Sequence, residues 1–177
     1  MKNRKLLIQC LYPGMHPGTA VDEELVVNSD RDVAVPGWLK GVVVEIKIPS
    51  GVRSIPDFAF ANCRLLRSVS IPDGVGEIGA AAFSNCRLLQ SVSLPASCSR
   101  IGEAAFQGCS SLRTAVVPAP APAIGPRAFS NCGSLDELDL DGVSREEALL
   151  LPAPSWGLPP SAWVMADDHA LRLSAWS

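Results

Sequence analysis

The sequence predicts a repeat solenoid, in which short coils of chain stack on one another around a shared core. Three observations lead to this fold class. Four segments of 23 residues, 48–70, 71–93, 94–116 and 117–139, align without a gap. The same apolar residue types return at the same places in each segment. A unit of this size cannot bury its own apolar face, so the copies must stack and share one core.

Six positions hold the same residue type in every segment, and the apolar ones predict ladders of identical side chains along the core. The eighth residue is Ile, an Ala-Phe pair follows, Cys comes three residues after the Phe, and Leu comes three residues after the Cys. The Phe ladder comprises Phe60, Phe83, Phe106 and Phe129, and the Cys ladder comprises Cys63, Cys86, Cys109 and Cys132. The second residue is Pro, which lacks an N–H and therefore predicts the end of a strand.

The repeated pattern AFxxCxxLxxVxIP resembles the BspA-like leucine-rich repeats, and the resemblance covers about half of the chain. It implies that LxxVxIP is a strand of one parallel sheet, that VxxIG is a second short strand, and that AFxxC is a tight helical or 3-10 turn. The residues agree with this reading. Leu66, Val69 and Ile71 are apolar while Ser68 and Ser70 alternate outward, as a half-buried strand requires.

Two corners of the repeat carry residues with special backbone properties. The residue before each ladder Cys is Asn62, Asn85, Gly108 or Asn131. Asn and Gly tolerate the left-handed region, so we expect a positive φ at all four places. The residue after each eighth-place Ile is Pro56, Gly79, Gly102 or Gly125. Because proline holds φ at about −65°, glycine at this corner is expected to provide space.

Both ends of the solenoid are expected to be closed by non-repeat caps. The expected organisation is one folded unit with an N-terminal cap at 1–41, a solenoid at 42–139 that opens with a partial coil at 42–47, and a C-terminal cap at 140–177. Gly37 occupies the place of the ladder Phe one period before Phe60. We expect the neighbouring Trp38 to cover the open end of the core, which would otherwise be wet.

The C-terminal cap is expected to hold a short helix and a hairpin. Ser144 followed by Glu147 is a capping-box pattern, and the Pro-Ala-Pro sequence at 152–154 stops the helix. The last part of the chain is typical of two short strands around Asp167, Asp168 and His169. Three tryptophans, Trp156, Trp163 and Trp176, follow the repeats and are expected to close the end of the core.

Charge and hydropathy exclude several classes of partner. Lys and Arg number 15 against 18 Asp and Glu, a net charge of −3. This balance lacks the excess of basic residues that is typical of proteins that bind nucleic acid. No run approaches the roughly 18 apolar residues of a membrane span. The apolar stretch Leu6 to Tyr12 is short for an export signal. The location stays open: cytoplasmic by sequence, but cell surface or secreted by the resemblance, because BspA-like repeats often belong to bacterial surface proteins.

The six cysteines are interpreted as small buried hydrophobes and free thiols, since four share one ladder position and Cys98 replaces Val52 and Val75. Only Cys10 is expected to react quickly, if its cap is loose. Zinc needs ligands from several directions, and the two histidines, His16 and His169, lie in opposite caps. No metal and no cofactor are expected.

No catalytic site is expected either. Gly74, Gly76 and Gly79 spell GxGxxG, but no acidic residue follows at the dinucleotide spacing, and the repeat frame explains the match as coincidence. The repeats contain no histidine, so a nucleophile there has no such base beside it. Glu146 and Glu147 are adjacent on a helix and do not face one another.

The leading hypothesis is therefore a non-enzymatic binding scaffold that presents the outward face of its sheet to a protein or glycan. The candidate face comprises Glu45, Lys47, Ser68, Ser70, Ser91, Ser93, Thr114, Val116, Glu137 and Asp139. Near one edge, Arg64, Arg67, Arg87 and Arg113 are suited to a carboxylate-bearing partner. The alternative is a structural or self-associating repeat unit, and a more remote one is an enzyme with its site in the C-terminal cap.

Overall fold

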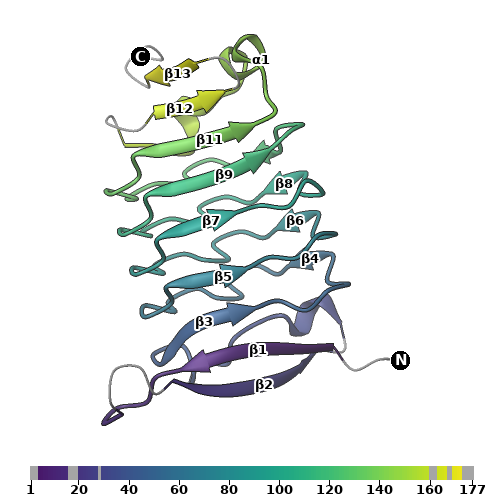
Figure 1. Cartoon of the computed structure of the whole chain (residues 1–177), viewed down its shortest axis with the longest axis vertical. Helices are drawn as coiled ribbons and strands as arrows, with labels where there is room; N and C mark the ends of the chain where they lie inside the picture. The colour runs from purple at the N-terminus through teal and green to yellow at the C-terminus, as the bar shows by residue number, and fades with distance from the viewer. Residues whose placement is uncertain (1–3, 16–19, 28, 160–162, 167–168, 173–177) are drawn as a thin grey trace.

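The structure is a computed structural model, and it describes residues 4–15, 20–27, 29–159, 163–166 and 169–172. The coils lie one above another, with a hairpin at each end of the stack (Figure 1). The main strands lie on one side: β3 (Val43–Lys47), β5 (Ser68–Ser70), β7 (Ser91–Ser93), β9 (Thr114–Pro118) and β11 (Glu137–Asp141). The chain is therefore a solenoid of stacked parallel strands, as the sequence predicts.

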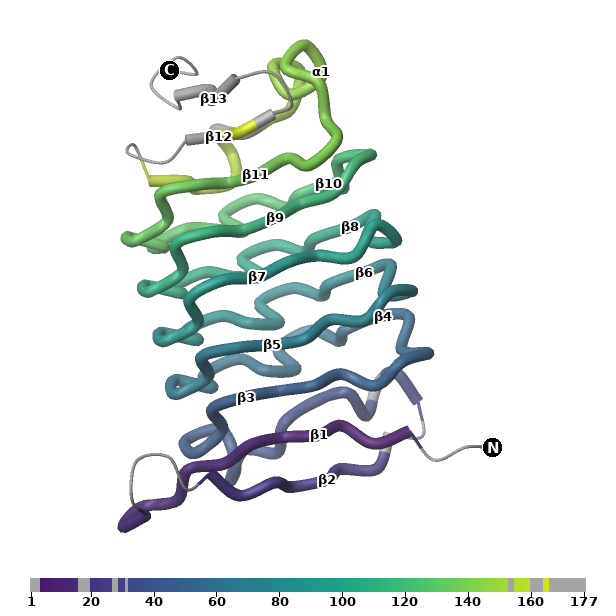
Figure 2. The backbone as a smooth tube through the Cα atoms, viewed as in Figure 1, coloured from purple at the N-terminus to yellow at the C-terminus, as the bar shows by residue number. Residues whose placement is uncertain are grey.

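A second parallel sheet lies behind the main strands (Figure 2). It has the order β10-β8-β6-β4 and consists of two-residue strands: β4 (Ser54–Ile55), β6 (Glu77–Ile78), β8 (Arg100–Ile101) and β10 (Ala123–Ile124). Ile55 pairs with Ile78, and Ile78 pairs with Ile101. Because each partner lies 23 residues further along the chain, the coil register is the sequence period.

The main strands do not form the one continuous sheet that the sequence predicts. They divide into β2-β1-β3-β5 and β13-β12-β11-β9-β7. Between β5 and β7 the Gln90 amide donates to the Arg67 carbonyl at 3.4 Å, but no strand ladder joins the two. Val69 of β5 is half-buried, whereas Val92 of β7 is buried. Strands of three residues offer few ladder bonds, so a small displacement of one coil interrupts the sheet.

The AFxxC segments form hydrogen-bonded turns that also tie each coil to the next. In the first turn the amides of Phe58, Phe60 and Asn62 donate to carbonyls of the next coil, while the amide of Cys63 donates to the Phe60 carbonyl. Positive φ is confirmed at all four predicted places, with values of 66°, 59°, 74° and 60° at Asn62, Asn85, Gly108 and Asn131. Four further non-glycine residues have a positive φ that the sequence does not predict: Phe58, Ala81, Ala104 and Arg127. Their side chains are not ones that favour this region, so the sequence carries no signal for them.

The Phe and Cys ladders lie side by side in the core. Successive Phe rings stack with centroids 5.1, 5.3 and 5.5 Å apart. The Cys86 Sγ donates to the Phe60 carbonyl at 3.3 Å, and the Cys109 Sγ repeats this contact with Phe83 at 3.2 Å. The thiol thus supplies a small apolar body and a weak donor for a buried carbonyl. All six cysteines are free and buried.

The glycine corner confirms the expected steric role. A Cβ added at Gly102 would lie 2.5 Å from the Ala80 nitrogen and 2.6 Å from the Gly79 carbonyl carbon, and these backbone atoms cannot move aside without separating the coils. We expect Gly102→Ala to lower the free energy of unfolding by roughly 1 to 3 kcal/mol, measured by urea denaturation. Gly133→Ala is the matched control, because a Cβ there meets nothing within 4 Å. Equal urea midpoints for the two variants would contradict this steric explanation.

The N-terminal cap is an antiparallel hairpin of β1 (Arg4–Cys10) and β2 (Val21–Val27), and β1 also pairs antiparallel with β3. Leu6, Ile8 and Cys10 point into the core and are at most 1% exposed. The expectation that Trp38 covers this end is wrong, since Trp38 is 71% exposed. A quickly reacting Cys10 requires a loose cap, and the hairpin instead buries this residue. A 3-10 helix, η1 (Asp30–Asp32), follows β2.

The C-terminal cap continues the coil geometry beyond the last periodic residue. Helix α1 (Arg145–Leu149) carries the expected capping box of Ser144 and Glu147. The 3-10 helix η2 (Ala153–Trp156) then takes the place of a further turn, because the Phe129 amide donates to the Trp156 carbonyl at 2.9 Å. Trp156 is 1% exposed and belongs to the same buried core as Phe129. This end of the core is therefore closed by a turn whose sequence no longer matches the repeat.

The last two strands form the expected hairpin. Strand β12 (Trp163–Ala166) pairs parallel with β11, and β13 (His169–Arg172) pairs antiparallel with β12. Asp167, Asp168 and Trp176 lie outside the described residues.

Candidate binding face

The candidate face is formed by alternate residues of the main strands, whose neighbours point into the core. The candidate residues form two rows: Glu45, Ser68, Ser91, Thr114 and Glu137 in one, and Lys47, Ser70, Ser93, Val116 and Asp139 in the other. Strand pairing aligns the rows within each of the two sheets, and the 23-residue period relates the two parts across the break between β5 and β7. The intervening residues include Ile46, Val92, Ala115 and Leu138, all at most 3% exposed. The core therefore fixes the backbone of the face but leaves its side chains free to vary.

The centre of the face is neutral and the two ends differ in charge. Ser68, Ser70, Ser91 and Ser93 are exposed, and within the described chain their hydroxyls make no internal hydrogen bond. At the N-terminal end Lys47 pairs with Glu45 at 3.4 Å. At the other end Glu137 and Asp139 are half-buried carboxyl groups on β11. Hydroxyl groups that both donate and accept lie between a mixed end and an acidic end.

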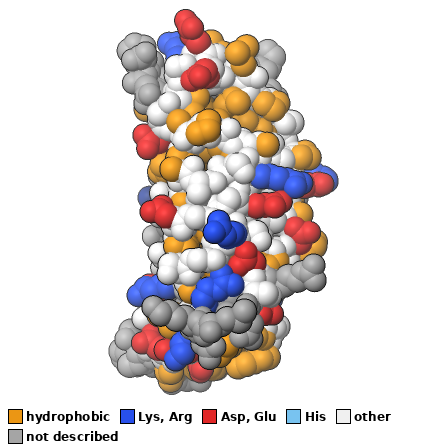
Figure 3. All heavy atoms as spheres, turned by 90° about the vertical axis from the view of Figure 1, so that its right-hand side faces the viewer, with side chains coloured by type: hydrophobic (Ala, Val, Ile, Leu, Met, Phe, Trp, Pro, Cys, Tyr) orange, Lys and Arg blue, Asp and Glu red, His pale blue; other side chains and the backbone are white. Residues whose placement is uncertain are grey.

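A groove of about 490 Å³ crosses the carboxyl ends of the main strands, where β5 and β7 separate. Ser70, Ser93, Asp73 and Asp141 contribute its polar groups, and the apolar lining includes Val69. Figure 3 views the molecule from this side, where apolar side chains gather over the upper part. The repeat pattern gives no signal for this groove, because its lining combines residues from β5 through to the end of β11.

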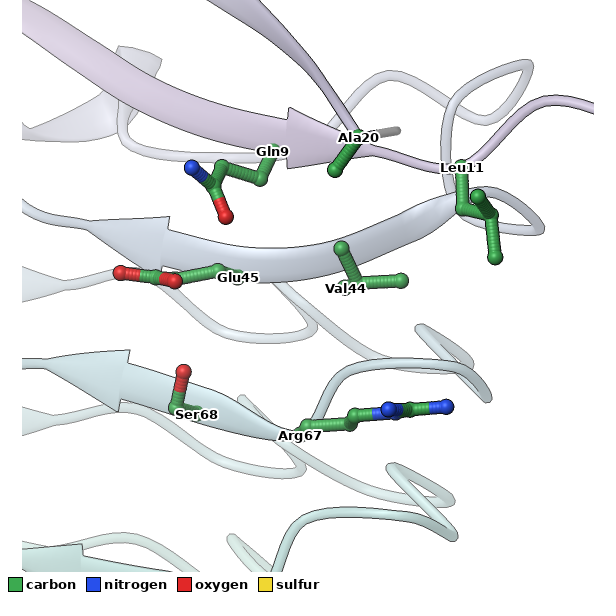
Figure 4. A pocket seen from close by; sticks show the side chains of 7 residues that line it. All are labelled: Gln9, Leu11, Ala20, Val44, Glu45, Arg67 and Ser68. Atoms are coloured by element: carbon green, nitrogen blue, oxygen red, sulfur yellow. The ribbon is translucent and has the colours of Figure 1, made fainter. Parts of the chain in front are cut away.

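A smaller hollow of about 250 Å³ lies at the amino ends of β3 and β5 (Figure 4). Its lining comprises Gln9, Leu11, Ala20, Val44, Glu45, Arg67 and Ser68. The Gln9 amide points toward β3, and the Arg67 side chain extends away from Ser68. Three of these seven residues, Gln9, Leu11 and Ala20, belong to the N-terminal hairpin. The alternation of Leu6, Ile8 and Cys10 in the sequence is the signal that indicates such a strand.

The glycines of the GxGxxG match and the Glu147 carboxylate lie in different parts of the fold. Gly74 has a positive φ of 96° in a turn. The Gly76 amide donates to the Arg53 carbonyl of the preceding coil at 2.7 Å, so both glycines serve the stacked coils. The Glu147 carboxylate accepts from the Ser144 amide at 3.0 Å, and this contact lowers the pKa of Glu147. Within the described ranges no three His, Cys, Asp or Glu side chains gather as a metal site.

The stacked coils, the two parallel sheets and the Phe and Cys ladders define a leucine-rich repeat solenoid. Residues 41–145 match the family model of the BspA type leucine rich repeat region in six copies. The chain belongs to this BspA-type leucine-rich repeat family, which commonly provides protein-interaction or surface scaffolds.

Solved structures with similar folds are bacterial leucine-rich repeat proteins. The Treponema pallidum leucine-rich repeat protein is 37% identical over 57% of this chain and 48% of its own, with a TM-score of 0.54. A leucine-rich repeat protein from Bacteroides ovatus is 28% identical over 58% of this chain and 27% of its own, with a TM-score of 0.53. The pneumococcal vaccine antigen PcpA shares the fold at 20% identity, over 70% of this chain and 31% of its own, with a TM-score of 0.57. This chain thus spans between about a quarter and a half of the proteins it resembles.

The search of curated proteins found no match. In the part of the chain that the structure describes, no helix has the length and apolar character needed to cross a membrane.

Proposed function

We propose that the chain is a non-enzymatic binding scaffold that presents the outward face of its main strands to a protein or glycan partner. The observation that carries this proposal is the double row of outward side chains on five successive strands. Four serines at its centre have hydroxyls with no internal partner among the described residues. Their backbone is fixed by the ladders beneath, so little order is lost when they bind, which favours affinity.

The family supports a scaffold role in general terms, and the geometry favours this surface over the others. The second sheet offers strands of only two residues, and its outward side chains pair with each other, as Arg100 does with Glu77 at 3.0 Å. The main strands offer a longer surface whose central polar groups are uncommitted. A partner that lies across them meets donors and acceptors at a spacing of roughly 4.8 Å from coil to coil.

The alternative, a structural unit that associates through its ends, is disfavoured by the caps. The edge strand β2 carries Asp22, Glu23 and Glu24, and charges on an edge strand oppose pairing with another sheet. Size-exclusion chromatography with light scattering over a concentration series separates the two ideas. A concentration-dependent increase in mass supports the structural unit, whereas a monomer at all concentrations supports the scaffold.

We expect the double variant Ser91→Lys with Ser93→Glu to abolish capture of the partner that a pull-down with the unaltered chain identifies. The substituted side chains replace small hydroxyls at the centre of the face. The free energy of unfolding should change by no more than about 0.5 kcal/mol, as at most surface positions. The matched control is Ser54→Glu with Ala123→Lys, which places the same charges on the second sheet. Equal capture by the Ser91 and Ser93 variant would show that the partner binds elsewhere.

A further inference from the structure

Four arginines form a basic edge where the chain enters the main strands. This arginine edge comprises Arg64, Arg67, Arg87 and Arg113, all exposed. Arg64 and Arg87 hold the same place in consecutive coils, and Arg67 and Arg113 hold the same place two coils apart. The segments 64–70, 87–93 and 110–116 contain no Asp or Glu. Positive charge is thus concentrated on one edge of a protein whose net charge is −3.

The charges of the arginine edge are unpaired, whereas three arginines elsewhere in the chain are paired with carboxylates. Arg4 pairs with Asp30 at 3.2 Å and Arg100 with Glu77 at 3.0 Å, and Arg127 pairs with Glu103. Within the described residues, none of the four guanidinium groups of the edge makes an ion pair or a hydrogen bond. Like charges on neighbouring coils repel one another. The four guanidinium groups are exposed and uncommitted among the described residues, so they are open to an external partner.

The 250 Å³ hollow lies at the start of this edge and adds a second, independent feature. Leu11, Ala20 and Val44 provide apolar surface, while Arg67 and Ser68 lie on the edge itself (Figure 4). The Glu45 carboxylate also lines the hollow, and its charge is paired with that of Lys47 at 3.4 Å. An apolar pocket beside a free guanidinium suits a segment that carries a carboxylate next to an apolar side chain. Arginine binds carboxylates through two parallel hydrogen bonds, which gives geometric selectivity.

We propose that the arginine edge binds a short acidic segment of a partner protein, with an apolar side chain of that segment in the hollow; this inference rests on the proposed scaffold function. The extent of the edge favours a short peptide over a long polyanion. From Arg67 to Arg113 the edge spans two coil steps, roughly 10 Å. In the fourth coil Asp136 takes the place of these arginines, and Glu137 follows. A polyanion continuing along the solenoid would meet these carboxylates.

The test uses a fluorescein-labelled short peptide of alternating Glu and Leu, and a second peptide with Gln in place of Glu. Fluorescence anisotropy with the full chain at low ionic strength should show binding of the Glu peptide only. Arg67→Gln with Arg113→Gln should weaken this binding by roughly tenfold or more, because two charge-assisted contacts are lost. Arg100→Gln with Arg127→Gln is the matched control and should leave the affinity unchanged. Circular dichroism melts check that both variants fold.

Several outcomes would overturn the inference. Equal binding of the Glu peptide by both double variants, or no binding by the unaltered chain, would contradict it. Tighter binding of heparin with the same arginine dependence would assign the edge to polyanions, and a dimer that Arg67→Gln with Arg113→Gln dissociates would assign it to a second copy. If the Ser91 and Ser93 variant loses the pulled-down partner while the Arg67 and Arg113 variant keeps it, this inference fails and the scaffold proposal stands.

Discussion

Phe83→Ala and Phe106→Ala are each expected to lower the free energy of unfolding by roughly 3 to 5 kcal/mol. Each ring is fully buried and stacks on a ring above and a ring below, with centroid separations of 5.1 to 5.5 Å along the ladder. Truncation removes the transfer free energy of the ring and leaves a cavity that flanking coils of fixed spacing cannot fill. Urea denaturation of the purified variants measures the loss.

Phe58→Ala provides a matched control for the Phe ladder. Phe58 is 61% exposed and has a φ of 57°, and alanine already stands at the equivalent places in the next two coils, as Ala81 and Ala104. This substitution should shift the unfolding free energy by no more than about 0.5 kcal/mol. A loss at Phe58 as large as that at Phe83 would show that the stacked rings are not the main apolar contribution of the core.

Raising the pH from 9 toward 12 is expected to destabilise the protein steeply. Burial raises the pKa of Cys63 and of Cys132 from 9.0 to about 12. In this range the unfolded chain has released both protons while the folded chain keeps them. The unfolded state then binds fewer protons, so the free energy of unfolding falls by about 1.4 kcal/mol per pH unit for each thiol. Below pH 9 both states keep the protons, and this contribution to stability is fully present.

Urea denaturation at a series of pH values measures this slope, with Cys132→Ala as the control. The variant loses one titrating thiol, so its unfolding free energy should fall less steeply above pH 9, whatever its stability at neutral pH. Identical slopes for the variant and the unaltered chain would mean that the Cys132 thiol is not shielded from water in the folded state.

The sequence by itself determined the coil register and the contents of the core. The ladder Phe and Cys recur every 23 residues, and stacked copies must place identical positions over one another because each coil is too small to bury its own apolar face. It also determined backbone conformation where the residue type is restrictive, as at Asn62 and Asn85. The outward rows of the candidate face follow from strand alternation alone. The coil register gives the positions of these side chains, and their role in binding is the proposal made above.

Only the tertiary structure decided how the stack is closed, where its main sheet breaks, and where hollows form. The hairpin of β1 and β2, which covers the first coil in place of Trp38, pairs antiparallel with β3 outside the repeat. The 3-10 helix η2, which contains Trp156, stacks on the last coil as a further turn although the sequence of η2 does not match the repeat. Periodicity specifies contacts between equivalent residues. Contacts between non-equivalent segments depend on how the non-repeat parts of the chain fold back onto the stack. The hollow beside Arg67 arises from such a contact, between the N-terminal hairpin and the first coils.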